Sequence, residues 1–215
     1  MALPRSLNFL RIGAGGQALE VYLDPICPYS AKIARSIDSH ILPLISPGGK
    51  YDGKLQLIAR VYAQPFHYLS HYHTEALLAF GQRYPDLFWG YLIAIFDTQR
   101  DFYNVPSQDL TGREVRDKLV AIATDYLEAK GKIDGPKSKV FGELRDALEN
   151  KKGADGSTNG GNAAEWALKY TIKIGRQNGI HVTPTVLFDG LKEDSVSSSW
   201  GQEEWNKFLA AKLDQ

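Results

Sequence analysis

The segment Asp24-Pro25-Ile26-Cys27-Pro28-Tyr29-Ser30 joins two patterns that predict different secondary structures. Before it, residues 19–24 (LEVYLD) alternate apolar and polar side chains, as a half-buried strand does. After it, residues 31–45 carry isoleucines and a leucine three or four positions apart, which predicts one buried helix face. Pro28 suits the first turn of that helix, because an N–H at that position would have no partner. The sequence therefore places Cys27 at a helix N-terminus directly after a strand.

The chain that follows predicts a second strand and then a block of helices. Residues 54–62 (KLQLIARVY) are typical of a strand, and the order strand, helix, strand favours a parallel pair with a right-handed crossover. Apolar stripes predict helices over 71–81, 86–97, 111–130 and 140–150. Thr111 and Glu114 fit a capping box that opens the third of these. Pro43 predicts that the first helix bends or ends in its last turn.

A glycine-rich loop, residues 153–162, separates this block from the C-terminal part of the chain. Residues 163–178 predict a helix that ends at Gly179, where a C-terminal glycine cap would stand. We expect its larger side chains to lie mostly inward: Trp166, Leu168, Tyr170, Ile172 and Ile174. A short strand over 186–189 follows, and Val196 could begin another. Ser199, with Gln202 as its capping-box partner, predicts the start of the last helix.

Composition excludes several classes of partner. The chain has 215 residues, with 25 basic and 25 acidic side chains, so its formal net charge is zero. A neutral chain argues against nucleic acid or an anionic membrane as a partner. No apolar run approaches the ~20 residues that span a bilayer, and the first residues make a poor secretory signal. We therefore expect no nucleic-acid partner, no membrane partner and a cytoplasmic location.

The chain contains a single cysteine, Cys27. This count excludes an intrachain disulfide, a cysteine-rich metal site and a dithiol cycle within one chain. Unpaired N–H groups and a partial positive charge at a helix N-terminus stabilise a thiolate, and Ser30 could offer its hydroxyl or its backbone N–H to the sulfur. Repulsion from Asp24 would oppose the thiolate. A buried, inert thiol is the alternative interpretation.

His67 follows the second predicted strand. Because the C-terminal ends of parallel strands share one edge of a sheet, we expect His67 to lie near Cys27. It could pair with the thiolate, orient a ligand carboxylate or act as a base. It could equally cap the next helix or bond a backbone carbonyl. A zinc site with His71 and His73 is disfavoured, because no His-Glu-x-x-His motif is present, so we expect no metal cofactor.

Three segments of the chain resemble the DsbA-like branch of the thioredoxin superfamily. They are Asp24-Pro25-Ile26-Cys27-Pro28-Tyr29-Ser30, Gln64-Pro65-Phe66-His67 and Val182-Thr183-Pro184-Thr185. The resemblance implies an α/β fold in which an all-helical domain is inserted into a thioredoxin fold. It implies a discontinuous thioredoxin-fold domain of residues 1–66 and 163–215, and a helical domain of residues 67–162. It also implies a cis bond between Thr183 and Pro184 that faces the active thiol.

The resemblance also bears on function. Redox members of this branch carry Cys-x-x-Cys, whereas Ser30 stands here at the second position. The resemblance then implies a glutathione-linked thiol oxidoreductase that forms a mixed disulfide at Cys27, with glutathione as co-substrate. The implied catalytic residues are Cys27, Ser30 and His67, and those implied to bind glutathione or substrate are Pro28, Tyr29, Thr183 and Pro184.

Two other functions stay open at this point. One is a glutathione-dependent transferase or isomerase acting on a small organic substrate, as in the related kappa-class glutathione transferases, which usually have serine where Cys27 stands. The other is a non-catalytic thioredoxin-fold binding module. The partner in each case is glutathione, a small molecule or a thiol. A homodimer is open as the assembly, because the kappa-like relatives are dimers.

Overall fold

The computed structural model describes residues 3–214 and contains one central β-sheet. Within that part of the chain the sheet has five strands in the order β1-β3-β2-β4-β5. Their bounds are β1 Arg11–Ile12, β2 Gln17–Leu23, β3 Leu55–Val61, β4 Thr185–Phe188 and β5 Leu191–Lys192. The pair β2 and β3 is parallel, and every other neighbouring pair is antiparallel. The parallel pair predicted from the sequence therefore forms the centre of the sheet.

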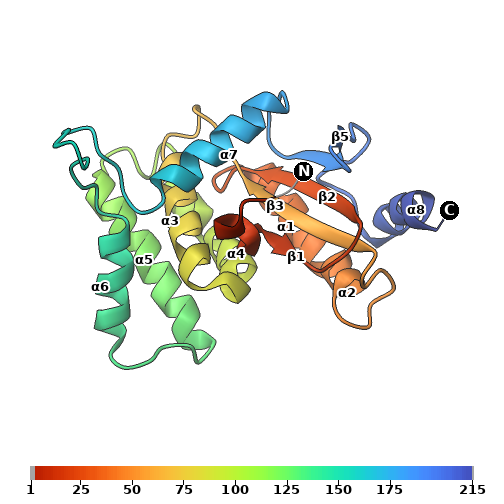
Figure 1. The fold of residues 1–215 in the computed structure, drawn as a ribbon, viewed down its shortest axis with the longest axis horizontal. Coiled ribbons are helices and arrows are strands. Elements are labelled where there is room, and N and C mark those ends of the chain that lie inside the picture. The colour runs from red at the N-terminus through yellow and green to blue at the C-terminus, as the bar shows by residue number, and fades with distance from the viewer. Residues whose placement is uncertain (1–2, 215) are drawn as a thin grey trace.

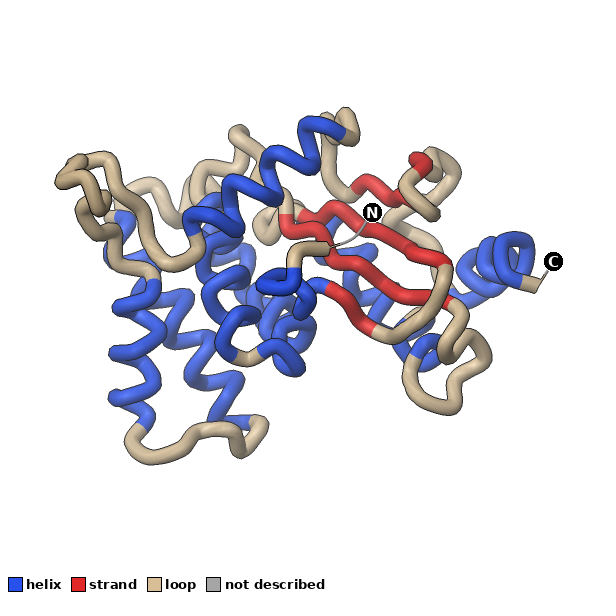
Figure 2. Tube along the Cα trace, viewed as in Figure 1, coloured by secondary structure: helices blue, strands red, loops and turns tan. Residues whose placement is uncertain are grey.

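Helices surround this sheet unevenly (Figure 1). The α-helices are α1 Pro28–His40, α2 Leu42–Ile45, α3 Ser70–Arg83, α4 Phe88–Thr98, α5 Gly112–Ala129, α6 Lys137–Ala147, α7 Glu165–Gln177 and α8 Gln202–Leu213. Short 3-10 helices span Arg5–Leu10, Pro85–Leu87 and Gln99–Phe102. Helices α3 to α6 gather on one side of the sheet and α8 lies beyond the other, as the blue and red segments of Figure 2 also show. This is a thioredoxin fold with a helical block inserted between β3 and β4, as the sequence predicted.

Local signals in the sequence locate several element ends correctly. Thr111 Oγ1 accepts from the Glu114 N–H at 3.3 Å, and Glu114 Oε2 accepts from the Thr111 N–H at 2.8 Å, so the predicted capping box opens α5. Gly179 follows α7 with a φ of 60°, a left-handed conformation that glycine adopts without a Cβ penalty. The first helix ends at His40, and Pro43 lies in the first turn of the separate helix α2.

Two predictions in the C-terminal part were wrong. Val196 lies outside any strand, because β5 is formed by Leu191 and Lys192 instead. Ser199 does not cap the last helix. Its hydroxyl and its N–H both contact the Ser197 hydroxyl in a preceding turn, so α8 begins two residues later. The N-cap is Gly201, whose N–H donates to Glu204 Oε2 at 2.9 Å.

The inward face of α7 also differs from the prediction. Its buried residues within the helix are Ala167, Thr171, Ile174 and Gly175, whereas Trp166 is 55% exposed. The Trp166 ring instead stacks on the Tyr170 ring, with centroids 5.8 Å apart. The buried face of α7 carries mostly small side chains and packs against α3, and Trp166 lies on the outer flank.

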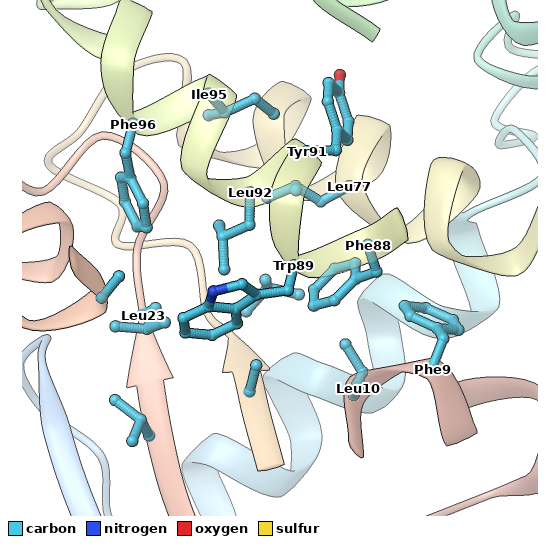
Figure 3. Close-up of a cluster of buried hydrophobic side chains, with 14 of the residues drawn as sticks. Phe9, Leu10, Leu23, Leu77, Phe88, Trp89, Tyr91, Leu92, Ile95 and Phe96 are labelled. Atoms are coloured by element: carbon cyan, nitrogen blue, oxygen red, sulfur yellow. The ribbon is translucent and has the colours of Figure 1, made fainter. Parts of the chain in front are cut away.

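One continuous hydrophobic core joins the sheet to the helical block. In Figure 3 the apolar side chains of α4 extend toward Leu23 of β2 and toward the N-terminal residues Phe9 and Leu10. Polar contacts reinforce the same junction. Trp89 Nε1 donates to Asp38 Oδ1 at 2.8 Å, and Arg35 donates to the Phe96 carbonyl at 3.1 Å. Because this core runs across the expected domain limits, those limits stay a prediction.

The close approach of α7 to Tyr62, the residue after β3, predicts opposite effects for two glycine substitutions. A Cβ at Gly175 would lie 2.2 Å from the buried Tyr62 ring, whereas a Cβ at Gly142 on α6 would meet open space. We expect Gly175→Ala to lower the free energy of unfolding by about 1–3 kcal/mol, because the ring must move. Gly142→Ala should raise it by about 0.5–1 kcal/mol through helix propensity. Urea denaturation of both variants checks this, and equal stabilisation by both would contradict the close packing.

Candidate active site

The sheet brings the three motifs to one edge. Leu23, the last residue of β2, pairs with Val61, the last residue of β3, so Cys27 and His67 both follow strands that end together. Thr185 begins the antiparallel strand β4 opposite Tyr22, so Thr183 and Pro184 arrive at the same edge from the other direction. This convergence is what the parallel arrangement predicted.

Cys27 is the N-cap residue of α1, a helix of 13 residues with Pro28 in its first turn. Its thiol donates to the Thr183 carbonyl across a sulfur–oxygen distance of 3.3 Å, and the residue is 4% exposed. The Thr183–Pro184 bond is cis, as predicted. The sulfur therefore lies between the N-terminal end of α1 and the carbonyl group that precedes the cis proline.

Asp24 organises the turn that carries Cys27. Its carboxylate is wholly buried, and it accepts the Ile26 N–H at 2.8 Å and the Gln64 N–H at 2.6 Å. The Asp24 N–H donates in turn to Ser30 Oγ at 3.1 Å. Ser30 is buried on the inner side of the turn, and within residues 3–214 its hydroxyl has no hydrogen bond to the sulfur. In this structure Ser30 supports the backbone before Cys27.

His67 lies against the same carboxylate. Its Nδ1 is 3.0 Å from Asp24 Oδ2, a contact that lacks the alignment of a hydrogen bond. The side chain keeps 21% of its surface exposed. The sequence predicted that His67 lies at this edge, but it did not predict Asp24 as its partner. The spacing carries no signal for this contact, because the two residues are on different loops.

A cavity of about 350 Å³ opens at the start of α1. Ile26 and Pro28, the neighbours of Cys27, form one wall, His67 contributes to the lining, and residues 103–106 close the other side. The lining surface is mostly apolar. Exposed apolar side chains also occur on the segments around the site: Tyr29, Phe66, Tyr68, Val105 and Val182. The site is thus built to contact mostly apolar groups, with the His67 imidazole and the Asn104 side chain among its polar members.

Gln99 is a second residue that sequence reasoning missed. From the 3-10 helix after α4, its Nε2 donates to the Pro25 carbonyl at 3.2 Å and to the Cys27 carbonyl at 3.4 Å. These bonds tie the turn of Cys27 to the helical block. A polar residue just past an apolar helix is the only trace of this in the sequence, and such residues are common at helix ends.

The other two histidines near His67, His71 and His73, lie in the first turn of α3. Within the described residues, no group of three or more His, Cys, Asp or Glu side chains could hold a metal ion. His73 is wholly buried, where Nδ1 lies 3.0 Å from the Leu69 carbonyl and the ring packs edge-on against Phe102. Burial lowers the pKa of His73 to about 4. Burial also lowers the pKa of His71.

The sheet order, the cis-proline loop beside the helix N-terminus and the inserted helices define the DsbA-like class of thioredoxin fold. Solved structures agree. A Pseudomonas syringae protein provisionally described as a protein-disulfide isomerase aligns with a TM-score of 0.67 at 23% identity, over 95% of this chain and 99% of its own. The thiol-disulfide oxidoreductase MdbA of Actinomyces oris aligns with a TM-score of 0.62 at 16% identity, over 93% and 82%. BdbD of Bacillus subtilis gives 0.60 at 15% identity, over 96% and 93%.

Sequence comparisons add nothing to this likeness. No family model matches the chain, and no curated protein matches it. The identities to the solved structures are low, so what they share with this chain is the fold. In the part of the chain that the structure describes, no helix has the length and apolar character needed to cross a membrane.

The burial of His73 predicts a loss of stability in mild acid. Its pKa falls from an ordinary 6.5 to about 4 in the folded protein, so between these values the unfolded chain binds a proton that the folded chain does not. Stability therefore falls as pH drops from 6.5 toward 4, by about 3 kcal/mol from this group. Urea denaturation across this range measures it. A His73→Gln variant should show a shallower pH dependence, and an unchanged slope would contradict the assignment.

Proposed function

We propose that this protein is a monothiol, glutathione-linked thiol oxidoreductase that acts through a mixed disulfide at Cys27. The observation that carries the proposal is the position of Cys27 at the N-terminus of α1, facing the Thr183 carbonyl. Thiolates at helix N-termini are the reactive form in thiol–disulfide exchange. The description of MdbA as a thiol-disulfide oxidoreductase on the same fold supports this chemistry.

The reaction has two exchange steps. The Cys27 thiolate attacks the glutathionyl sulfur of a mixed disulfide, forms a disulfide with glutathione and releases the other thiol as a thiolate, which takes up a proton. A second glutathione gives up its proton and attacks that disulfide, which yields oxidised glutathione and restores the Cys27 thiolate. An external thiol is needed for the second step because Ser30 has no sulfur and Cys27 is the only cysteine.

The residues around the sulfur suit this cycle. Pro28 and the exposed Tyr29 lie beside Cys27 on α1, and Thr183 with Pro184 faces it from the loop before β4. We assign these four residues to glutathione, whose peptide backbone would run past the Thr183 loop. Cytoplasm, where reduced glutathione is abundant, is the compartment in which a monothiol cycle can turn over.

A glutathione-dependent transferase or isomerase is the second candidate, and the cavity beside Cys27 favours it. Its volume of about 350 Å³ lies within the range of about 300–1,000 Å³ that small-molecule pockets have. In that case glutathione itself would supply the reacting sulfur. Conjugation activity that survives Cys27→Ser would assign the site to this class.

Glutathionylation of Cys27 tests the proposed function. We expect the folded protein to gain one glutathione when it is incubated with oxidised glutathione, and to lose it on addition of reduced glutathione. Intact mass spectrometry detects the adduct, and Cys27→Ser should form none. The urea-unfolded wild type serves as a control for thiol competence. An adduct that forms on the unfolded chain but not on the folded one would identify Cys27 as a buried, inert thiol and overturn the proposal.

A further inference from the structure

The cavity beside Cys27 is lined mostly by apolar side chains, with polar groups on His67, Tyr103 and Asn104. Ile26 and Pro28 flank the reacting residue, and Val105 and Pro106 lie opposite them. These four side chains are apolar, and Val105 is 78% exposed at the rim. Both chain neighbours of Cys27 line the cavity, so we take this apolar space as the place of the organic group on the sulfur that Cys27 displaces. The cavity therefore fits the organic part of a leaving thiol better than it fits the charged ends of glutathione.

His67 carries an imidazole into the lining of this cavity. Its Nδ1 is buried against Asp24 Oδ2 at 3.0 Å, so the 21% of the side chain that stays exposed lies on the rest of the ring, which includes Nε2. Asp24 cannot turn away, because its oxygens are held by the Ile26 and Gln64 N–H groups. A fixed buried carboxylate in contact with Nδ1 orients the ring, which presents the other nitrogen for proton exchange.

We propose that His67 donates a proton to the leaving thiolate in the first exchange step, and that the cavity selects a thiol with an apolar, uncharged organic group. Cys27 S⁻ forms its bond to the glutathionyl sulfur as the bond to the departing sulfur breaks. The departing sulfur takes the electron pair of that bond and the proton from His67 Nε2. In the second step the thiol of reduced glutathione returns a proton to His67. Asp24 is a positioning residue. This proposal rests on the proposed function.

Two glutathione mixed disulfides of similar shape can distinguish whether His67 acts as a proton donor or only as a structural residue. In the first the leaving thiol is benzyl mercaptan, whose thiolate is basic and benefits from a proton. In the second it is para-nitrothiophenol, which departs as a stable thiolate. We expect His67→Gln to lower kcat/KM for the benzyl compound by about 100-fold or more, the range of general acid catalysis. The nitrophenyl compound should lose less than about threefold, since its thiolate needs no proton.

Asp24→Asn should show the same selectivity on top of a loss common to both compounds, because the carboxamide keeps one acceptor oxygen, places an NH2 where the other oxygen accepts an N–H, and removes the charge beside the imidazole. Equal losses on both compounds in His67→Gln would assign the histidine a structural role and overturn this inference. If the wild type transfers glutathione from neither compound, the proposed function itself fails. The two failures are therefore distinguishable in one set of assays.

A matched pair of thiols tests the apolar cavity. Mercaptoethanol and benzyl mercaptan are both poor leaving groups, so a preference for the benzyl disulfide reports on the cavity. We expect Val105→Asp to lower the rate with the benzyl compound about tenfold or more and to leave the mercaptoethanol compound unchanged. Leu191→Asp, at an equally exposed apolar residue on β5 outside the cavity, is the control and should change neither rate. A wild type without preference between the two compounds would overturn the apolar assignment.

Discussion

A single buried carboxylate, that of Asp24, determines the geometry on which the site depends. An ionised group without water around it is costly unless hydrogen bonds and opposite charge surround it. Asp24 meets this condition by accepting N–H groups from Ile26 and Gln64 and by contacting the His67 ring. The Asp24 carboxylate therefore joins the loop after β2 to the loop after β3. Any movement of Cys27 away from His67 would leave part of this charge unsatisfied.

The fold was predictable because its signals are local and repeated. Strand periodicity over residues 19–24 and 54–62, with a helix between them, left few topologies other than a parallel pair. Once β2 and β3 are parallel, Cys27 and His67 must follow the same edge of the sheet. The register from Leu23 to Val61 shows that convergence, and the loop of Thr183 joins it because β4 runs antiparallel to β2.

What escaped prediction depends on contacts between distant segments. Gln99 reaches the carbonyl groups of Pro25 and Cys27 only because the helical block packs against the turn. The partner of His67 was missed for a related reason, since Asp24 was interpreted as a charge near the sulfur rather than as the anchor of a loop. Trp166 faces outward although its position looked inward, because α7 packs against α3 through other, mostly small residues. Periodicity identifies a helix face, but packing decides how close it lies.

The continuous core between sheet and helices has a mechanical consequence. A hinge needs a boundary that few contacts cross, and here buried side chains of α4 and β2 share one interior while Trp89 and Arg35 bond across the junction. Rigid-body opening of the helical block would have to break that interior. The two walls of the cavity are therefore preorganised, and an incoming molecule gives up little free energy to reshape them. The protein then discriminates between ligands by how well they fit the fixed shape of the cavity. Side-chain rotations at the rim of the cavity govern entry.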